Sequence, residues 1–122
     1  LHPATISEYR DKDGPVAWVL LIPTTRALMD QFVEGYISER ELFNRTPLNT
    51  QYEALYLCSA LVLPEYRRKG IAKNLMLKAV EQMRCDHPLK YLFVWPFTKE
   101  GELAAESLAH VVGLPLMRRQ KA

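Results

Sequence analysis

The sequence predicts one domain of mixed α and β structure, in which helices pack on a sheet that combines antiparallel and parallel strands. A length of 122 residues suits a single domain with one core. Two strand-like runs near the start are separated only by a short turn, which is the order of an antiparallel hairpin. Two later runs flank a helical repeat, which is the order of a crossover between parallel strands. Residues 1–122 are therefore predicted to form a single α/β (α+β) domain.

The first predicted element is a β-hairpin in residues 4–25. Residues 11–14 read Asp-Lys-Asp-Gly, and both Asp and Gly accept the backbone conformations of a tight turn. The run at 16–22 is continuously apolar, which is typical of a strand buried on both faces. The sequence therefore predicts two antiparallel strands, the second of them buried.

An insert of mixed character follows at residues 24–50. Its pattern predicts a short helix around 27–32, a break at Gly35 and a further helical segment with Ser38 as its cap. Pro47 ends this segment, because proline cannot continue a helix that has already begun.

A long strand is predicted at 54–63, where the Leu-rich composition is too hydrophobic for an edge strand. Pro64 closes it, because proline lacks the amide hydrogen that a ladder needs. An amphipathic helix follows, and its apolar face consists of Ala72, Leu75, Met76, Ala79, Val80 and Met83. A second buried strand is predicted at 91–95, parallel to the first because a helical crossover joins them.

The chain is predicted to end with a second amphipathic helix at 103–112 and a short strand at 114–117. Gly113 stands where a helix C-terminal cap belongs. The order of elements is then hairpin, helical insert, strand, helix, strand, helix. This order predicts a mixed, mostly antiparallel sheet with flanking helices.

Composition and charge exclude several classes of function. The 16 Lys and Arg against 14 Asp and Glu give a net charge of +2, too weak for the basic face of a nucleic-acid-binding protein. No apolar run approaches the roughly 20 residues that cross a bilayer, so no membrane partner is expected. Cys58 and Cys85 lack the spacing of a metal site or of a disulfide framework. We therefore expect reduced thiols, no metal and a cytoplasmic protein.

A basic turn at residues 67–72 is suited to an anion. Arg67, Arg68 and Lys69 precede Gly70, at the point where the predicted helix begins. The first amides of a helix lack intrahelical partners, and the aligned peptide dipoles place partial positive charge there. Gly70 has no Cβ to hold a ligand away. The turn therefore suits a pyrophosphate, and a solvated basic turn without a ligand is the alternative.

Residues 60–80, which read ALVLPEYRRKGIAKNLMLKAV, resemble the acetyl-CoA-binding motif of the GNAT superfamily of N-acetyltransferases. In that family a strand, and often a proline, precede Arg or Gln, two residues, Gly, one residue, and Gly or Ala. Arg67, Gly70 and Ala72 occupy these positions, with the aromatic Tyr66 before the arginine. The resemblance implies a GNAT-like fold in which the two parallel strands splay apart.

The resemblance also implies that the chain binds acetyl-CoA as acyl donor. In the family, backbone amides of the turn hold the pyrophosphate, and the end of the preceding strand pairs with the pantetheine arm. The positions that it assigns to the coenzyme are Ala60, Leu61 and Val62 at the strand end and Arg67, Arg68, Lys69, Gly70, Ile71, Ala72 and Lys73 in the turn.

The proton-transfer residues of the family are not matched. Many members use a carboxylate on the strand before the turn as base and a tyrosine of the last helix as acid, but the corresponding positions here are Leu57 and Ala109. The sequence therefore leaves the catalytic residues unknown. The substitutes that it offers are Tyr56, Cys58 and His110. Each also suits a structural role, in the core for the two strand residues and on the surface for the histidine.

The predicted function is an acetyl-CoA-dependent N-acetyltransferase that acts on the amine of a small molecule or a peptide by direct attack. A non-catalytic acyl-CoA-binding module is the alternative, because both proton-transfer positions are lost. An interaction domain with a basic turn is a third reading. The sequence leaves a monomer and a homodimer open. Family members usually carry a strand and helices before the hairpin, so either such a segment is missing here or the insert at 24–50 replaces it.

Overall fold

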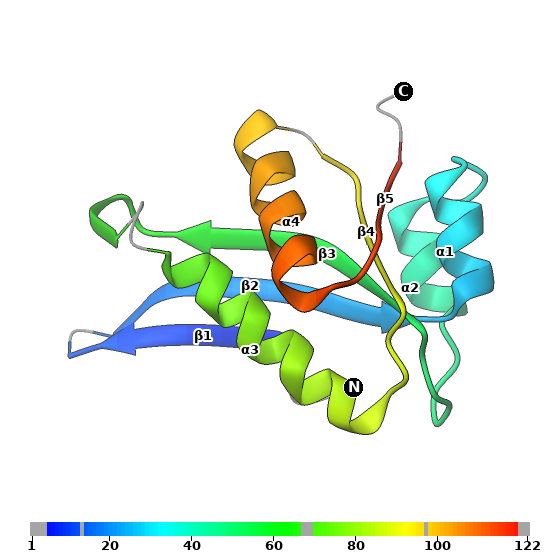
Figure 1. Ribbon diagram of the computed structural model, residues 1–122, viewed down its shortest axis with the longest axis horizontal. Helices are drawn as coiled ribbons and strands as arrows, with labels where there is room; N and C mark the ends of the chain where they lie inside the picture. The colour runs from blue at the N-terminus through cyan, green and yellow to red at the C-terminus, as the bar shows by residue number, and fades with distance from the viewer. Residues whose placement is uncertain (1–4, 13, 67–69, 97, 120–122) are drawn as a thin grey trace.

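The computed structural model describes residues 5–12, 14–66, 70–96 and 98–119. Within these ranges, five strands form one sheet and four α-helices pack on it (Figure 1). The elements are β1 (Ile6–Asp11), β2 (Gly14–Thr24), α1 (Arg26–Val33), α2 (Glu39–Arg45), β3 (Ala54–Val62), a 3₁₀ turn (Pro64–Tyr66), α3 (Ile71–Asp86), β4 (Tyr91–Val94), α4 (Lys99–Val112) and β5 (Leu116–Arg118). Each strand and α-helix that the sequence predicts is present.

The strands lie in the sheet in the order in which they occur along the chain, β1-β2-β3-β4-β5. β1 with β2 and β2 with β3 form long antiparallel ladders, whereas β3 with β4 and β4 with β5 are parallel over three residue pairs each. The helices α3 and α4 are the crossovers that join the parallel strands. The predicted mixed sheet is confirmed, and the parallel orientation of β5 is a feature that the sequence did not reveal.

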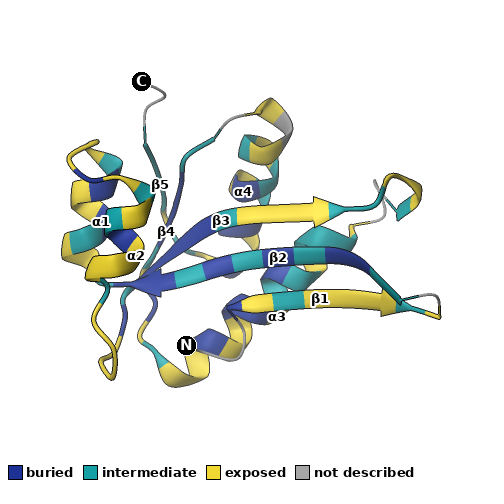
Figure 2. Cartoon of the chain, turned by 180° about the vertical axis from the view of Figure 1, so that it is seen from behind, coloured by how far each residue is buried: buried dark blue, intermediate teal, exposed yellow. Residues whose placement is uncertain are grey.

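The helices cover the two faces of the sheet unequally. α3 and α4 lie across one face (Figure 1), whereas α1 and α2 lie against the other face, only at the end where β3, β4 and β5 meet. Figure 2 shows that β1 and the outer half of β3 are exposed on the side turned to the viewer. The sheet is therefore covered on both faces only at one end.

Alternate residues of β3 and β4 divide between two apolar cores. Leu55 and Leu92 belong to the core under α3 and α4, while Tyr56 and Phe93 belong to the core under α1 and α2. Successive residues of a strand point to opposite faces, so this division follows directly from strand geometry. The paired parts of β3 and β4 are consequently the most enclosed part of the sheet, as the prediction of non-edge strands requires.

Two predictions from the sequence need correction. The apolar run of β2 is buried on one face only: Val19 and Leu21 are buried, but Trp18 and Leu20 are half-buried because α1 and α2 do not extend over them. α4 begins before the predicted start at residue 103, because Thr98 Oγ1 accepts a hydrogen bond from the Gly101 amide at 3.0 Å and caps an additional polar turn.

Truncation of Leu108 on α4 is expected to destabilise the domain strongly. Its side chain is fully buried in the core under α3 and α4, and a Leu→Ala change in such a place costs about 2–5 kcal/mol. Leu103→Ala is the matched control on the same helix, because Leu103 is 53% exposed and its truncation should cost at most about 0.5 kcal/mol. Urea unfolding followed by circular dichroism measures both losses. Equal losses in the two variants would contradict this packing of α4.

Candidate functional site

β3 and β4 separate after a short parallel ladder. The ladder ends at the pair Tyr56–Phe93, although β3 continues to Val62. Continued in the same register, it would place Pro96 beside Ser59, where proline has no amide hydrogen to donate. Beyond Tyr56, the edge of β3 that faces β4 has no strand partner among the described residues.

A β-bulge at Cys58 accompanies this separation. In the ladder of β2 and β3, Leu21 lies opposite Leu57 but Leu20 lies opposite Ser59, so Cys58 is an additional residue on β3. A bulge bends its strand and increases the local twist. The bend lies where β3 leaves β4 and helps to keep the two strands apart.

A cleft of about 340 Å³ lies between the separated strands. The sheet, α3 and the start of α4 form its walls, and many of the side chains there are small, which leaves the space open. The lining residues are Leu21, Leu57, Cys58, Ser59, Ala60, Ala72, Met76, Val94, Trp95, Pro96, Thr98, Gly101, Ala104 and Ala105. An apolar cleft of this size is typical of small-molecule sites.

α3 begins beside the cleft without a side-chain cap. Thr25, Ser38 and Thr98 cap the other three helices of the described ranges, but Gly70 precedes α3 in the left-handed conformation, with φ +73°. A Cβ at position 70 would meet no described atom within 4 Å. The amides of the first turn of α3, whose residue Ala72 lines the cleft, are therefore not engaged by a cap.

The coenzyme positions predicted on β3 lie along its separated edge. Ala60 lines the cleft, Leu61 is 56% exposed and Val62 ends the strand. Figure 2 shows the change along β3 from buried to exposed at this point. An open strand edge is thus present where the resemblance predicts a strand-like ligand.

The coenzyme positions predicted in the turn lie only partly within the described residues. Gly70 precedes α3, and Ile71, Ala72 and Lys73 form its half-buried first turn. The basic positions before them, Arg67, Arg68 and Lys69, lie outside the described residues.

Tyr56, a predicted catalytic candidate, is buried in the core under α1 and α2. Its ring lies 5.0 Å from the ring centroids of both Phe32 and Phe93. Its hydroxyl donates a hydrogen bond of 2.6 Å to Glu39 Oε2. Burial, this hydrogen bond and the charge of Glu39 raise the pKa of Tyr56 above its ordinary value. The phenol therefore keeps its proton at neutral pH and acts as a hydrogen-bond donor.

Cys58, the second candidate, lines the cleft two positions further along β3. Burial and, to a smaller extent, the charge of Glu39 raise the pKa of its thiol to about 11. The thiolate is the nucleophilic form, so at neutral pH Cys58 is a small, weakly polar wall residue.

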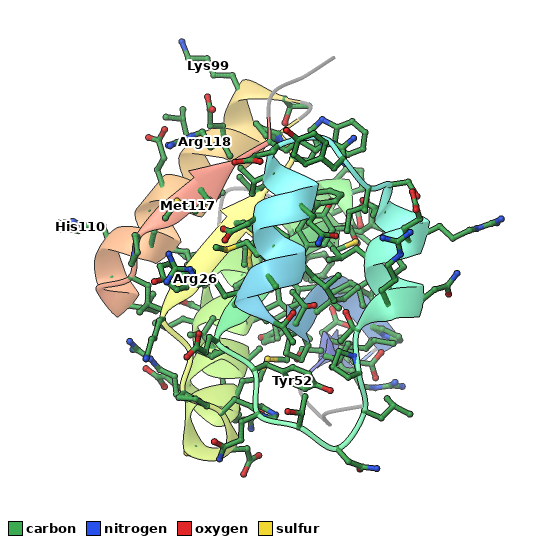
Figure 3. The ribbon with its side chains drawn as sticks, turned by 90° about the vertical axis from the view of Figure 1, so that its right-hand side faces the viewer. Arg26, Tyr52, Lys99, His110, Met117 and Arg118 are labelled. Carbon is green, nitrogen blue, oxygen red and sulfur yellow. The ribbon has the colours of Figure 1, made fainter. Side chains whose placement is uncertain are left out.

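His110, the third candidate, does not line the cleft. It is exposed on α4 and points away from the body of the molecule (Figure 3). Ala109, at the position of the family's tyrosine, is buried in the core, and Leu57, at the position of the family's carboxylate, lines the cleft. Neither position supplies a proton-transfer group.

Arg119 lies on the α1–α2 side of the separated strands. Its guanidinium carbon lies 4.5 Å from the ring centroid of Phe32 and 4.2 Å from that of Trp95. Its Nη1 donates a hydrogen bond of 2.7 Å to the carbonyl oxygen of Ile37. The segment after β5 is thereby linked to the turn that leads into α2.

No sequence motif singled out Glu39 or Arg119 as a site residue. The pattern of Ser38 and Glu41 predicts the start of α2, and the structure contains that reciprocal capping box. The contact of Glu39 with Tyr56 has no such local signal, because it depends on how the insert packs on the sheet.

Some kinds of site are absent from the part of the chain that the structure describes. No three His, Cys, Asp or Glu side chains gather there in a way that would hold a metal ion. Both cysteines are free thiols. None of the helices in these ranges has the length and apolar character to span a bilayer.

The sequence and the fold have counterparts among known proteins. The model of the Acetyltransferase (GNAT) family matches residues 5–113. The chain belongs to this family. Family membership confirms the resemblance first inferred from residues 60–80 and extends it over the hairpin and the insert. No curated protein matches the GNAT chain in sequence.

The GNAT chain also resembles a solved structure, the crystal structure of Chaetomium thermophilum Naa20 in complex with a bisubstrate analogue. The superposition has a TM-score of 0.55 and covers 88% of this chain at 14% sequence identity. At this identity the likeness is one of fold. The GNAT chain spans 50% of the length of that Naa20 chain.

Alkylation should report the protonation of Cys58. Because the thiolate reacts and the pKa of the thiol is about 11, the rate of alkylation with iodoacetamide should rise with pH around that value.

The pKa of Cys58 in the folded state exceeds the ordinary value of 9.0, so the folded protein holds this proton more tightly. The contribution of Cys58 to stability is therefore lost as the pH rises from about 9 through 11.

The measurement uses a Cys85→Ser variant, in which Cys58 is the remaining thiol, with mass spectrometry to follow alkylation. The same chain unfolded in urea supplies the reference rate. Equal rates in the folded and the unfolded chain at neutral pH would contradict the buried position of Cys58.

Proposed function

We propose that the chain is an acetyl-CoA-dependent N-acetyltransferase that transfers the acetyl group directly to the amine of a small molecule or a peptide. The observation that carries this proposal is the separation of β3 from β4 beside the uncapped start of α3. An open strand edge, an apolar cleft and a helix N-terminus thereby adjoin one another. Membership of the GNAT family supports acyl transfer as the reaction.

The donor is proposed to lie along β3 and against the start of α3. The edge of β3 at Ala60 and Leu61, which has no strand partner on the β4 side among the described residues, can pair with the amide groups of an extended arm, as an added strand would. The amides at the start of α3 suit a pyrophosphate, as does the space at Gly70, where a Cβ would meet no described atom within 4 Å. Arg67, Arg68 and Lys69 would add positive charge to this position.

The acceptor is proposed to approach from the α1–α2 side. Cys58 and Trp95 line the cleft and also pack against the core under α1 and α2, so the cleft adjoins that side of the sheet. The Naa20 structure of similar fold holds a bisubstrate analogue, which supports direct transfer between two substrates in one site.

A non-catalytic acyl-CoA-binding module is the second candidate. It is favoured by Leu57 and Ala109, which occupy the two proton-transfer positions of the family with apolar side chains. Such a module would use the same strand edge and the same helix N-terminus but would need no group that accepts a proton.

Two measurements separate the candidates. Titration calorimetry with coenzyme A tests binding, and thiol release from acetyl-CoA tests transfer to a peptide α-amine, a lysine side chain, an aliphatic diamine and an arylamine. Binding together with acceptor-dependent release supports the enzyme, and binding without release supports the module. The absence of both heat and a thermal shift at saturating coenzyme A would overturn both candidates.

Gly70→Leu should weaken coenzyme A binding by about tenfold or more, because the new side chain would project into the space proposed for the pyrophosphate. Gly113→Leu is the matched control: Gly113 also has φ +73°, a Cβ there would also meet no described atom, and it lies at the end of α4. Both variants carry left-handed strain of about 1–2 kcal/mol. Titration calorimetry measures the affinities, and the same affinity in both variants would count against the pyrophosphate position.

A further inference from the structure

We propose that Glu39 accepts the proton of the incoming amine and that Tyr56 is the positioning residue that holds its carboxylate. This inference rests on the proposed function, because it assigns the acceptor side of the same site. It supplies, from the helical insert, the carboxylate that the strand position Leu57 lacks.

The carboxylate of Glu39 is fixed by a hydrogen bond from a buried ring. The bond from Tyr56 Oη to Glu39 Oε2 is 2.6 Å long, which is in the range of charge-assisted O–H···O bonds. The Tyr56 residue is 1% exposed and its ring packs against Phe32 and Phe93, so it has little freedom to move. Within the described ranges Glu39 Oε1 accepts no hydrogen bond, and this oxygen can face a substrate.

The backbone at Glu39 is held from both directions. The capping box of Ser38 and Glu41 fixes the first turn of α2, in which Glu39 is the first residue. Arg119 donates to the carbonyl oxygen of Ile37, just before the cap. The backbone of Glu39 is fixed by this turn, and its carboxylate is fixed by the hydroxyl of Tyr56. The side chain is therefore preorganised, as a proton acceptor in a site must be.

Tyr56, which holds the carboxylate, lies where the strands separate. Tyr56 is the last residue of β3 that pairs with β4, and Cys58, two positions further, lines the cleft. Tyr56 and Cys58 both pack against the core under α1 and α2, so the carboxylate bonded to Tyr56 lies on the same side of the sheet as the Cys58 side chain. Because Tyr56 belongs to the core under α1 and α2, Glu39 approaches the gap from the side opposite α3.

The two β3 side chains near the Glu39 carboxylate add no charge to this side of the site. Tyr56 and Cys58 are protonated at neutral pH. The nearby cation, Arg119 on the segment after β5, stacks on Phe32 and Trp95. A carboxylate in this setting attracts an acceptor amine in its ammonium form and can accept the further proton that the neutral nitrogen loses as it attacks.

The acceptor reacts as a neutral amine, after its ammonium form has released one proton to solvent. A proton passes from the acceptor nitrogen to Glu39, and the nitrogen forms a bond to the thioester carbonyl carbon. The bond from that carbon to sulfur breaks, and the sulfur leaves with the electron pair. The proton held by Glu39 returns through solvent to the sulfur, so the products are the acetylated amine and the thiol of coenzyme A.

The test compares Glu39→Gln with Glu34→Gln in the thiol-release assay with acetyl-CoA and the four amines named above. Glutamine can still accept the hydrogen bond from Tyr56 but takes no proton. Glu39→Gln should lower kcat/KM for the acceptor by about 100-fold or more, while Glu34→Gln, which removes the same charge from the exposed end of α1, should change it by less than about twofold. KM for acetyl-CoA should stay the same in both variants.

Tyr56→Phe tests the positioning role. Loss of the hydroxyl should lower kcat by about tenfold while KM for acetyl-CoA stays unchanged, because the carboxylate loses its fixed orientation. If Tyr56 has only a structural role, the melting temperature falls and kcat of the folded protein does not. That result would overturn the positioning part of the proposal.

Cys58 provides a readout that needs no acyl transfer. In the Cys85→Ser background, Glu39→Gln should move the pH midpoint of Cys58 alkylation below about 11, and Glu34→Gln should leave it in place. An unchanged midpoint would overturn the placement of the carboxylate. Transfer by the parent chain with equal rates in both glutamine variants would overturn this inference and leave the proposed function intact. The absence of transfer by the parent chain would overturn both.

Discussion

The separation of β3 from β4 is the constraint on which the rest of the site depends. Parallel neighbours would ordinarily continue to pair, but the ladder ends at Tyr56–Phe93. The bulge at Cys58 bends β3, and Pro96 removes a donor from the segment after β4. The open edge and the cleft both follow from these local features, and α3 begins at the same place because β3 leads into it through Pro64–Tyr66.

The paired residues of β3 and β4 also fix the position of the proposed donor side relative to the proposed acceptor side. Alternate side chains of β3 and β4 anchor α3 and α4 on one face and α1 and α2 on the other. The donor is proposed to use the first face and the acceptor the second, so a short and thoroughly packed stretch of sheet fixes the distance between them. The hydrogen bond from Tyr56 to Glu39 joins the insert to this stretch, and the hydrogen bond from Arg119 to Ile37 joins the insert to the segment after β5.

Much of the fold could be predicted because its signals are local. The turn at residues 11–14, the cap at Ser38 and the closing Pro64 each determine an element boundary through the backbone of a few residues. The predictions were wrong where contacts between residues far apart in the sequence determine burial. Exposure of Trp18 on β2 depends on how far the insert extends over the sheet, and no periodicity in β2 contains that information.

By itself, the sequence determined the order of the elements, the apolar faces of α3 and α4 and the motif at residues 60–80 that identifies the family. These features depend on residues that are close together in the sequence, because the side chains of such residues determine the local backbone conformation. Only the tertiary structure decided that Glu39 reaches Tyr56, 17 residues away, and that Arg119 reaches Ile37, 82 residues away. Such contacts depend on which face of the sheet the insert covers. The burial of apolar side chains in both cores determines that face, and no single segment of the sequence contains this information.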